Sequence, residues 1–353
     1  MTNLLTPAKV GRYTLRNRLV MSPMTRSRCD DSTGIPTDLV PVYYGQRAGA
    51  GLIITEGTGP SPMSKGYVRT PGIYSSGQVG GWRKVCDAVH AKGGLIFLQV
   101  MHCGRIAHPE MLPGKAQPLA PSAVKAAGQS FTNAGMRDHA EPRALGAEEV
   151  RTIVKEYATA TRLALEAGFD GVELHAASGY LPEQFLSSKT NLRSDEYGGS
   201  VERRARFIVD VLQAMIAVAG ADRVGMKIAP EMGFNDIADA TPKETYRHLV
   251  ERIAPFGMAY LHVQLFGAKF DYHGTLRRLF KGAYLHGSGL TQQTAERLIE
   301  SREADATVFG SLYLANPDLP ERFAKGAALN APDQSTFYTP GAKGYTDYPV
   351  LAA

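Results

Sequence analysis

A histidine, a serine and a tyrosine lie close together in the segment His175-Ala-Ala-Ser178-Gly-Tyr180. The imidazole and the hydroxyl are hydrogen-bond donors that would hold a carbonyl oxygen, and the phenol would supply a proton. The same pattern also fits a core histidine whose hydrogen bonds are satisfied, beside a tyrosine that only packs. Residue types alone leave both interpretations open.

Glycine and serine gather in two later segments, His286-Gly287-Ser288-Gly289 and Gly310-Ser311. Glycine lets backbone N–H groups approach a phosphate closely, although Gly-Ser-Gly is also common in plain turns. The two segments predict a phosphate site only if the fold brings them to the same place, so the elements around them decide the matter.

Short apolar runs rich in β-branched residues recur along the chain, and each is followed by a longer stretch with helical periodicity. The predicted strands are Arg18–Met21, Gly51–Thr55, Gly94–Val100, Gly171–His175, Val224–Ala229, Tyr260–Gln264, Gly282–His286 and Ala306–Gly310. The clearest predicted helices are Ala147–Ala167, Ser200–Ala219, Pro242–Phe256, Thr291–Ser301 and Asn316–Lys325. Alternating strands and helices indicate an α/β protein with a parallel sheet.

Eight such units predict a single closed (β/α)8 TIM barrel, and an open doubly wound sheet is the alternative. The alternative is disfavoured because the segment after the first strand, Met21–Arg26, contains no glycine. We expect one domain over residues 1–353, with an N-terminal β-hairpin at Val10–Asn17 and an aromatic tail packed on the barrel from Asn330 onward. The long loop after the third strand, residues 101–146, is expected to be a lid-like insertion, because loops of this length often form lids or binding walls.

Reactive side chains of a TIM barrel lie at the C-terminal ends of its strands, and phosphates bind after strands seven and eight. This rule raises the phosphate interpretation of the two glycine segments to equal standing with a plain turn. It selects, besides the residues already named, Pro23, Met24, Thr25, Gly57, Gln99, Met101 and Lys227.

The composition is that of an ordinary globular enzyme, since 44% of the 353 residues are hydrophobic and 21% are charged. The formal net charge of +5 is scattered, and its densest group, Arg277, Arg278 and Lys281, is too short for a nucleic-acid tract. We therefore expect a small-molecule substrate and no nucleic-acid partner.

The three cysteines, Cys29, Cys86 and Cys103, match no Cys-x-x-Cys pattern, and the nine histidines show no metal-ligand spacing. We expect a reduced, cytoplasmic location and no metal. No apolar run approaches the ~18 residues of a membrane-spanning helix, so we expect no membrane association.

The ordered motifs of the chain resemble the old yellow enzyme family of FMN-dependent NAD(P)H:ene-reductases nearly from end to end. The motifs that carry the resemblance are Leu5–Gly11, Asn17–Arg26, Tyr43–Ala48, Gly51–Glu56, Gly66–Gly72, Gln99–Arg105, Ala167–His175, Asn191–Gly199, Ala315–Asp318 and Gly344–Pro349. The resemblance implies a TIM barrel that binds FMN at its C-terminal mouth. NAD(P)H would reduce the flavin, and flavin N5 would pass hydride to the C=C bond of an α,β-unsaturated carbonyl or nitro compound.

The resemblance also implies roles for the residues at the mouth. His175 and Ser178 would hold the substrate oxygen, Tyr180 would donate the proton, and Tyr67 and Tyr338 would contact the substrate. The implied cofactor-binding residues are Thr25 at flavin O4, Gln99 at the pyrimidine edge, Lys227 at N1 and O2, and Pro23, Met24, Gly57, Gly287, Ser288, Gly289, Gly310 and Ser311 along the ring or phosphate.

Four positions depart from the family pattern. Ser178 stands where Asn or His is usual, Lys227 and Ser311 stand where arginine is usual, and Met101 replaces a tryptophan. One alternative is therefore a flavin-binding barrel with weak reductase activity that acts as an isomerase or ligand-binding protein. Another is a flavin-free lyase that uses Lys227 for a Schiff base. The choice between NADH and NADPH, and between a monomer and a small homo-oligomer, stays open.

Overall fold

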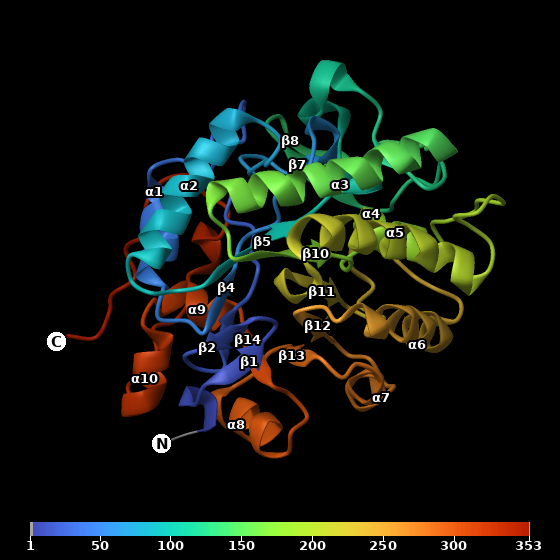
Figure 1. Cartoon of the computed structure of the whole chain (residues 1–353). Coiled ribbons are helices and arrows are strands. Elements are labelled where there is room, and N and C mark those ends of the chain that lie inside the picture. Colours follow the sequence, from blue (N-terminus) through green and yellow to red (C-terminus); the bar gives the residue numbers. More distant parts are fainter. Residues whose placement is uncertain (1–2, 353) are drawn as a thin grey trace.

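Eight parallel strands close into a barrel in the computed structural model, which describes residues 3–352 (Figure 1). The strands are β3 (Leu19–Met21), β4 (Leu52–Ile54), β5 (Ile96–Val100), β10 (Gly171–His175), β11 (Val224–Ile228), β12 (Tyr260–Gln264), β13 (Ala283–Gly287) and β14 (Ala306–Phe309). Each pairs with the next in chain order, and β14 returns to β3. The predicted closed barrel is confirmed, because an open sheet would have two edge strands that each pair on one side only, whereas every strand of this sheet pairs on both sides.

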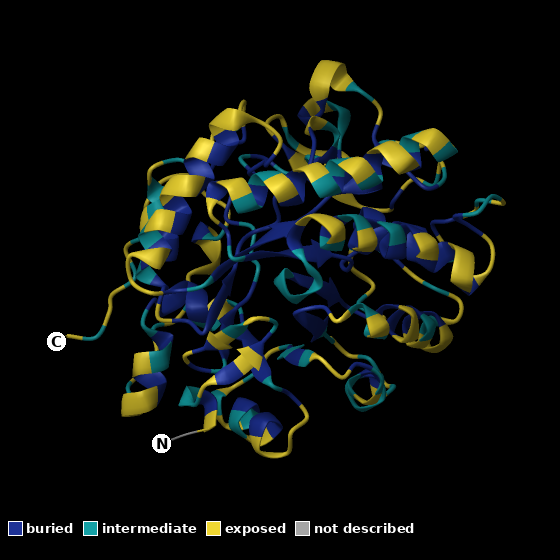
Figure 2. Cartoon of the chain, in the orientation of Figure 1, coloured by how far each residue is buried: buried dark blue, intermediate teal, exposed yellow. Residues whose placement is uncertain are grey.

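Helices surround the strands, and their inner faces are buried while their outer faces are exposed (Figure 2). They are α1 (Leu39–Gln46), α2 (Ser76–His90), α3 (Ala147–Ala167), α4 (Leu181–Leu186), α5 (Val201–Ala219), α6 (Pro242–Ile253), α7 (Tyr272–Leu279), α8 (Gln292–Glu300), α9 (Ser311–Ala315) and α10 (Leu319–Lys325). No helix within residues 3–352 is both long and apolar enough to cross a membrane.

The ends of α3 show how local sequence sets the elements. Glu149 in the first turn accepts a hydrogen bond from the Gly146 amide at 2.8 Å, and Gly168 ends the helix with a φ of 104°. The predicted bounds of this helix are confirmed. The helix predicted from Asn316 instead begins at Leu319, because Pro317 disfavours helical backbone at the residue before it.

The predicted N-terminal hairpin, β1 (Ala8–Val10) and β2 (Tyr13–Leu15), closes the bottom of the barrel. Val10 and Leu15 are buried against the barrel interior, and the Tyr13 hydroxyl donates to the carbonyl of Asp170, just before β10, at 2.7 Å. This end of the barrel is therefore filled, which leaves the opposite end for a ligand.

The segment 101–146 between β5 and α3 is built from short turns and strands rather than from one irregular loop. It contains the two-residue strands β6 (Leu119–Ala120) and β9 (Arg143–Ala144) and a hairpin of β7 (Gln129–Thr132) and β8 (Gly135–Asp138). Its lid-like role stays a prediction.

Buried arginines hold the C-terminal tail. Arg26 donates to the Gly344 carbonyl and Arg28 to the Thr336 carbonyl, both at 2.8 Å. Tyr345 stacks on Tyr43 with a centroid distance of 4.1 Å. The expected packing of this aromatic tail on the barrel is confirmed.

Candidate active site

The residues selected by the strand-end rule meet at the C-terminal mouth of the barrel. A Cβ placed on Gly57 after β4 would lie 2.5 Å from the Met101 sulfur after β5, so Met101 lies directly on this glycine. A Cβ on Gly310 after β14 would lie 3.6 Å from the Met24 sulfur after β3. Residues far apart in the sequence thus border one site.

A tight turn after β10 carries the three predicted catalytic residues. Ser178 and Gly179 both have left-handed backbone, with φ of 61° and 74°, and the turn leads into α4 at Tyr180. The turn brings the ring of Tyr180 edge-on to His175, with centroids 4.8 Å apart. The Tyr180 hydroxyl lies 2.9 Å from that of Tyr67, which comes from the loop after β4.

Burial keeps these side chains uncharged. It raises the pKa of Tyr180 well above its ordinary value, and the neighbouring Tyr67 adds to this rise. It lowers the pKa of His175 well below its ordinary value, and the charges of Lys227 and His262 lower it further. At neutral pH the site therefore presents a protonated phenol and a neutral imidazole.

His175 is not a histidine satisfied by the core. Its Nδ1 atom is buried and has no hydrogen-bond partner among residues 3–352. A buried unpaired ring nitrogen is costly, and a bound molecule that pairs with it recovers that cost. The structure thus contradicts the interpretation of His175 as a satisfied core residue.

Asn235 is a site residue that the sequence reasoning missed. Its side-chain amide donates to the Ser178 carbonyl at 2.8 Å and lies beside the phenols of Tyr67 and Tyr180, opposing the rise in their pKa values. Ser178 itself lies with its hydroxyl 3.5 Å from the Met232 sulfur. Met232 and Asn235 both come from the loop after β11, whereas the strand-end rule had selected only Lys227, which lies on β11 itself. The available signal was the segment Gly233-Phe234-Asn235, because glycine and asparagine are the residues that most readily adopt the left-handed backbone of a turn, as both do here.

Three polar side chains at the mouth leave hydrogen-bonding capacity unused within the described part of the chain. Lys227 on β11 is 5% exposed, and its ammonium makes no hydrogen bond or ion pair with residues 3–352. Gln99 on β5 is 2% exposed and uses its amide nitrogen on Glu173 at 2.7 Å, while its carbonyl oxygen accepts no bond there. Thr25 is half-buried, and its hydroxyl has no described partner either.

The two glycine segments lie on the neighbouring strands β13 and β14. The backbone amides of Ser288, Gly289, Gly310 and Ser311 donate no hydrogen bond to any residue that the structure describes. The Ser288 hydroxyl accepts from the Leu265 amide at 2.6 Å, and the Ser311 side chain is exposed at the start of α9. Backbone amides without partners at adjacent strand ends can donate hydrogen bonds to an anion, whereas the amides of a closed turn are already used within the turn.

Tyr338 lies apart from the turn that carries Ser178 and Tyr180. It is 61% exposed, and its carbonyl accepts from Arg69 at 2.9 Å, two residues after Tyr67. The structure thus places the Tyr338 backbone beside the Tyr67 loop, while its side chain is free to meet solvent or a ligand.

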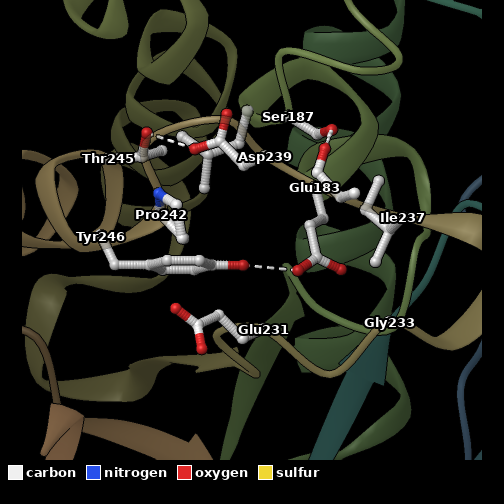
Figure 3. Close-up of a pocket in the computed structure, with 11 residues that line it drawn as sticks. Glu183, Ser187, Glu231, Gly233, Ile237, Asp239, Pro242, Thr245 and Tyr246 are labelled. Carbon is white, nitrogen blue, oxygen red and sulfur yellow. Dashed lines mark hydrogen bonds between the residues drawn. The ribbon is translucent and has the colours of Figure 1, made fainter. Parts of the chain in front are cut away.

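A cavity of about 330 Å³ lies behind the turn that follows β10, between α4 and α6 (Figure 3). The buried Glu183 carboxylate points into it and accepts from the Tyr246 hydroxyl at 2.5 Å and from the Gly179 amide at 2.6 Å. Burial raises the pKa of Glu183 to about 7. The cavity therefore borders the reverse side of the turn that carries Ser178.

Comparison with known proteins decides the family. Residues 3–330 match the model of the NADH:flavin oxidoreductase / NADH oxidase family. A probable flavin mononucleotide-dependent alkene reductase of Leishmania infantum is 43% identical, covering 99% of this chain and 97% of the relative. The chain belongs to the old yellow enzyme family.

Two solved structures agree with this family and with its fold. Morphinone reductase in complex with tetrahydroNAD superposes with a TM-score of 0.95 at 43% identity, over 100% of this chain and 98% of that one. The old yellow enzyme homologue of Zymomonas mobilis superposes with a TM-score of 0.96 at 38% identity, over 99% and 100% of the two chains.

The expected enzyme class and cofactors are confirmed by this membership: the protein is an FMN-dependent oxidoreductase with a nicotinamide nucleotide as reductant. The residues present fit FMN, because a buried unpaired cation, free polar side chains and unpaired amides meet at one mouth. The weakly active isomerase or ligand-binding alternative is not favoured, since the matched proteins are reductases by name. The alternative of a flavin-free lyase is excluded, because the family to which the chain belongs is flavin-dependent.

Proposed function

We propose that the protein reduces the C=C bond of α,β-unsaturated carbonyl or nitro compounds, with hydride passing from NAD(P)H by way of flavin N5. The proposal rests on the Tyr180 phenol, which is buried, protonated at neutral pH and in hydrogen-bond contact with Tyr67. The names of the alkene reductase and morphinone reductase relatives support the same reaction class.

His175 and Ser178 hold the substrate oxygen in this proposal. Neutral His175 donates one ring N–H, and donors aimed at an oxygen that becomes negative stabilise the developing enolate or nitronate. The serine hydroxyl is shorter than the amide or imidazole usual at this position. A bridging water therefore completes its contact with the substrate.

Tyr180 supplies the proton to the substrate carbon next to the carbonyl or nitro group. Tyr67 shares a hydrogen bond with this phenol, so it orients the Tyr180 hydroxyl and offers a proton to replace the one transferred. Asn235 fixes the same region through the Ser178 carbonyl. The three side chains thus act as one unit around the proton donor.

We propose that FMN is held by the residues that the family pattern implies. Thr25 donates at the flavin edge, Gln99 faces the pyrimidine ring and Lys227 opposes the negative charge of the reduced flavin. Pro23, Met24, Gly57, Gly287, Ser288, Gly289, Gly310 and Ser311 line the ring and the phosphate. The phosphate then depends on backbone amides and the Ser311 hydroxyl, without the usual arginine at that position.

We further propose that residues 1–353 act as one flavin-binding domain in which segment 101–146 covers the mouth. Its buried residues Met101, Cys103 and Ile106 pack in the same cluster as Tyr180 and, at its edge, Tyr67. The segment is thus attached directly to the proposed substrate pocket. Tyr67 and Tyr338 then form the outer wall on which a substrate rests.

The test separates the two half-reactions of the FMN-loaded enzyme. Flavin absorbance is followed anaerobically as NADH or NADPH bleaches it, and again as 2-cyclohexen-1-one restores it. In D2O the product should carry solvent deuterium next to its carbonyl. A flavin that is bleached by both nucleotides yet never reoxidised by enones or nitroalkenes would overturn the proposal.

A further inference from the structure

A fully buried carboxylate lies within the barrel, one layer below the mouth. Glu173 on β10 has no exposed surface and receives two hydrogen bonds from opposite sides. Gln99 on β5 donates from Nε2 at 2.7 Å, and His262 on β12 lies with Nδ1 at 3.1 Å. Burying a charged carboxylate costs free energy unless the carboxylate is paired and hydrogen-bonded.

An ionised carboxylate only accepts hydrogen bonds, so it fixes how its partners are turned. Gln99 must present its NH2 group to Glu173, which leaves its carbonyl oxygen on the other side. His262 must carry its proton on Nδ1, and its unprotonated Nε2 then faces Gly287, where a Cβ would lie 3.0 Å away. Glu173 thus sets the hydrogen-bonding character of two side chains at once.

Glu173 on β10 lies opposite Gly225 on β11, and Lys227 is two residues further along β11, so both side chains point to the same side of the barrel wall. Burial lowers the pKa of Lys227 to about 8, and the Glu173 charge opposes this fall. The other titratable groups that face Lys227 from the flanking strands are His175 and His262. A histidine side chain is either neutral or positive, so neither residue supplies the negative charge that stabilises the Lys227 ammonium.

We propose that Glu173 is a positioning residue of the flavin site, which turns the Gln99 carbonyl toward the cofactor and supplies the counter-charge of Lys227. The inference rests on the proposed function, in which Gln99 and Lys227 face the flavin. It adds a reason why a lysine can serve here in place of arginine. Arginine stays charged in any environment, whereas a buried lysine needs a nearby carboxylate.

The midpoint potential of bound FMN, measured against pH, reports the charge of Lys227. At a pH where Lys227 is protonated before and after reduction, the flavin takes up two electrons and one proton, and the midpoint potential falls by about 30 mV per pH unit. At a higher pH, where Lys227 is neutral before reduction and takes up a proton when the flavin is reduced, two protons accompany the two electrons and the potential falls by about 60 mV per pH unit. We expect this bend near pH 8 in the unmodified holoenzyme. In Glu173→Gln, which keeps the shape and removes the charge, the bend should move about one pH unit lower.

Two further variants make the test decisive. Lys227→Met should lose the bend, and Glu173→Asp, which keeps the charge, should hold it near its original pH even if FMN binds less tightly. A bend that persists in Lys227→Met overturns the proposed placement of Lys227 at the flavin. A bend that is lost in Lys227→Met but unmoved in Glu173→Gln overturns the role of Glu173 alone.

FMN affinity at pH 6 tests the Gln99 part, because Lys227 is protonated in both proteins there. Glu173→Gln can then present its own NH2 to Gln99 and let that amide turn, so we expect FMN to bind several-fold more weakly. His262→Gln is the matched control that removes a partner of Glu173 and leaves its contact with Gln99. Equal affinity of Glu173→Gln and the unmodified protein at pH 6 would contradict this part.

Discussion

The hydroxyl oxygens of Tyr180 and Tyr67 lie 2.9 Å apart at the mouth of the barrel, although 113 residues separate them in the sequence. The contact joins the loop after β4 to the turn after β10, and Asn235 from the loop after β11 donates to the Ser178 carbonyl in the same turn. A phenol that is buried and bonded to a second phenol is held in one orientation. The proposed proton donor is therefore fixed before a substrate arrives.

Tyr180→Phe should slow reoxidation of the reduced flavin by an enone roughly 10²–10⁴-fold, the usual effect of losing a general acid. Bleaching of the flavin by NAD(P)H should change little, because no proton passes to a carbon in that step. Stopped-flow absorbance measures both rates. Tyr67→Phe is the matched control, and its reoxidation rate should fall less, since Tyr67 only orients and resupplies Tyr180. If Tyr180→Phe slowed bleaching and reoxidation equally, the role assigned to Tyr180 would be contradicted.

Ser178→Asn should improve enone reduction. The backbone at Ser178 has a φ of 61°, a conformation in which asparagine is much more common than serine. The longer side chain also reaches the substrate oxygen directly, and we expect roughly a tenfold gain in kcat/KM, the worth of about one hydrogen bond.

Steady-state kinetics with 2-cyclohexen-1-one measure the Ser178→Asn effect, and Ser178→Ala is the control. The alanine variant should lose activity if the hydroxyl acts through a water. No gain for asparagine together with no loss for alanine would show that the position does not touch the substrate.

Ser311→Arg should strengthen FMN binding. Ser311 is exposed at the strand end where four backbone amides have no described partner, so a guanidinium there would add a charge-assisted contact to the phosphate. We expect the Kd for FMN, measured by quenching of flavin fluorescence, to fall about tenfold or more at low salt, with the gain shrinking as salt rises. Ser311→Gln, of similar length without charge, is the control; equal affinities for serine and arginine would contradict the prediction.

The barrel could be predicted from the sequence because each strand is a short apolar run that is followed by a helical pattern. The bounds of α3 were also readable, since Gly146, Glu149 and Gly168 mark its ends locally. The hairpin of β1 and β2 was found for the same reason. Elements whose signals lie within a few residues are the ones that local rules identify.

The site was only partly readable because its contacts join distant loops. The strand-end rule found Lys227 and Gln99, yet it could not show that Glu173 holds one and stabilises the charge of the other. Asn235 was missed because its contact with Ser178 depends on two turns of left-handed backbone. Such relationships arise from tertiary packing: the local sequence can mark a turn at Gly233 and Asn235, but it does not encode which residues that turn contacts.

Glu183→Gln should change how the stability of the protein depends on pH. Burial raises the pKa of Glu183 from an ordinary value of 4.5 to about 7, so the folded state binds its proton more tightly than the unfolded state does. The free energy of unfolding therefore falls as pH rises from about 4.5 to about 7, by roughly 3 kcal/mol in total from this group. Glutamine does not titrate, so the stability of the variant relative to the unmodified protein should increase as the pH rises from about 4.5 to about 7.

The measurement is the difference in unfolding free energy, or in Tm, between the two FMN-loaded proteins at several pH values from 4.5 to 8. Working with the difference removes other titrating groups, such as Glu56, whose pKa burial also raises to about 7. The exposed Glu148→Gln is the control and should show no such trend. A Glu183→Gln difference that stays constant with pH would mean that the carboxylate remains ionised beside Tyr246, in spite of its burial behind the turn that follows β10.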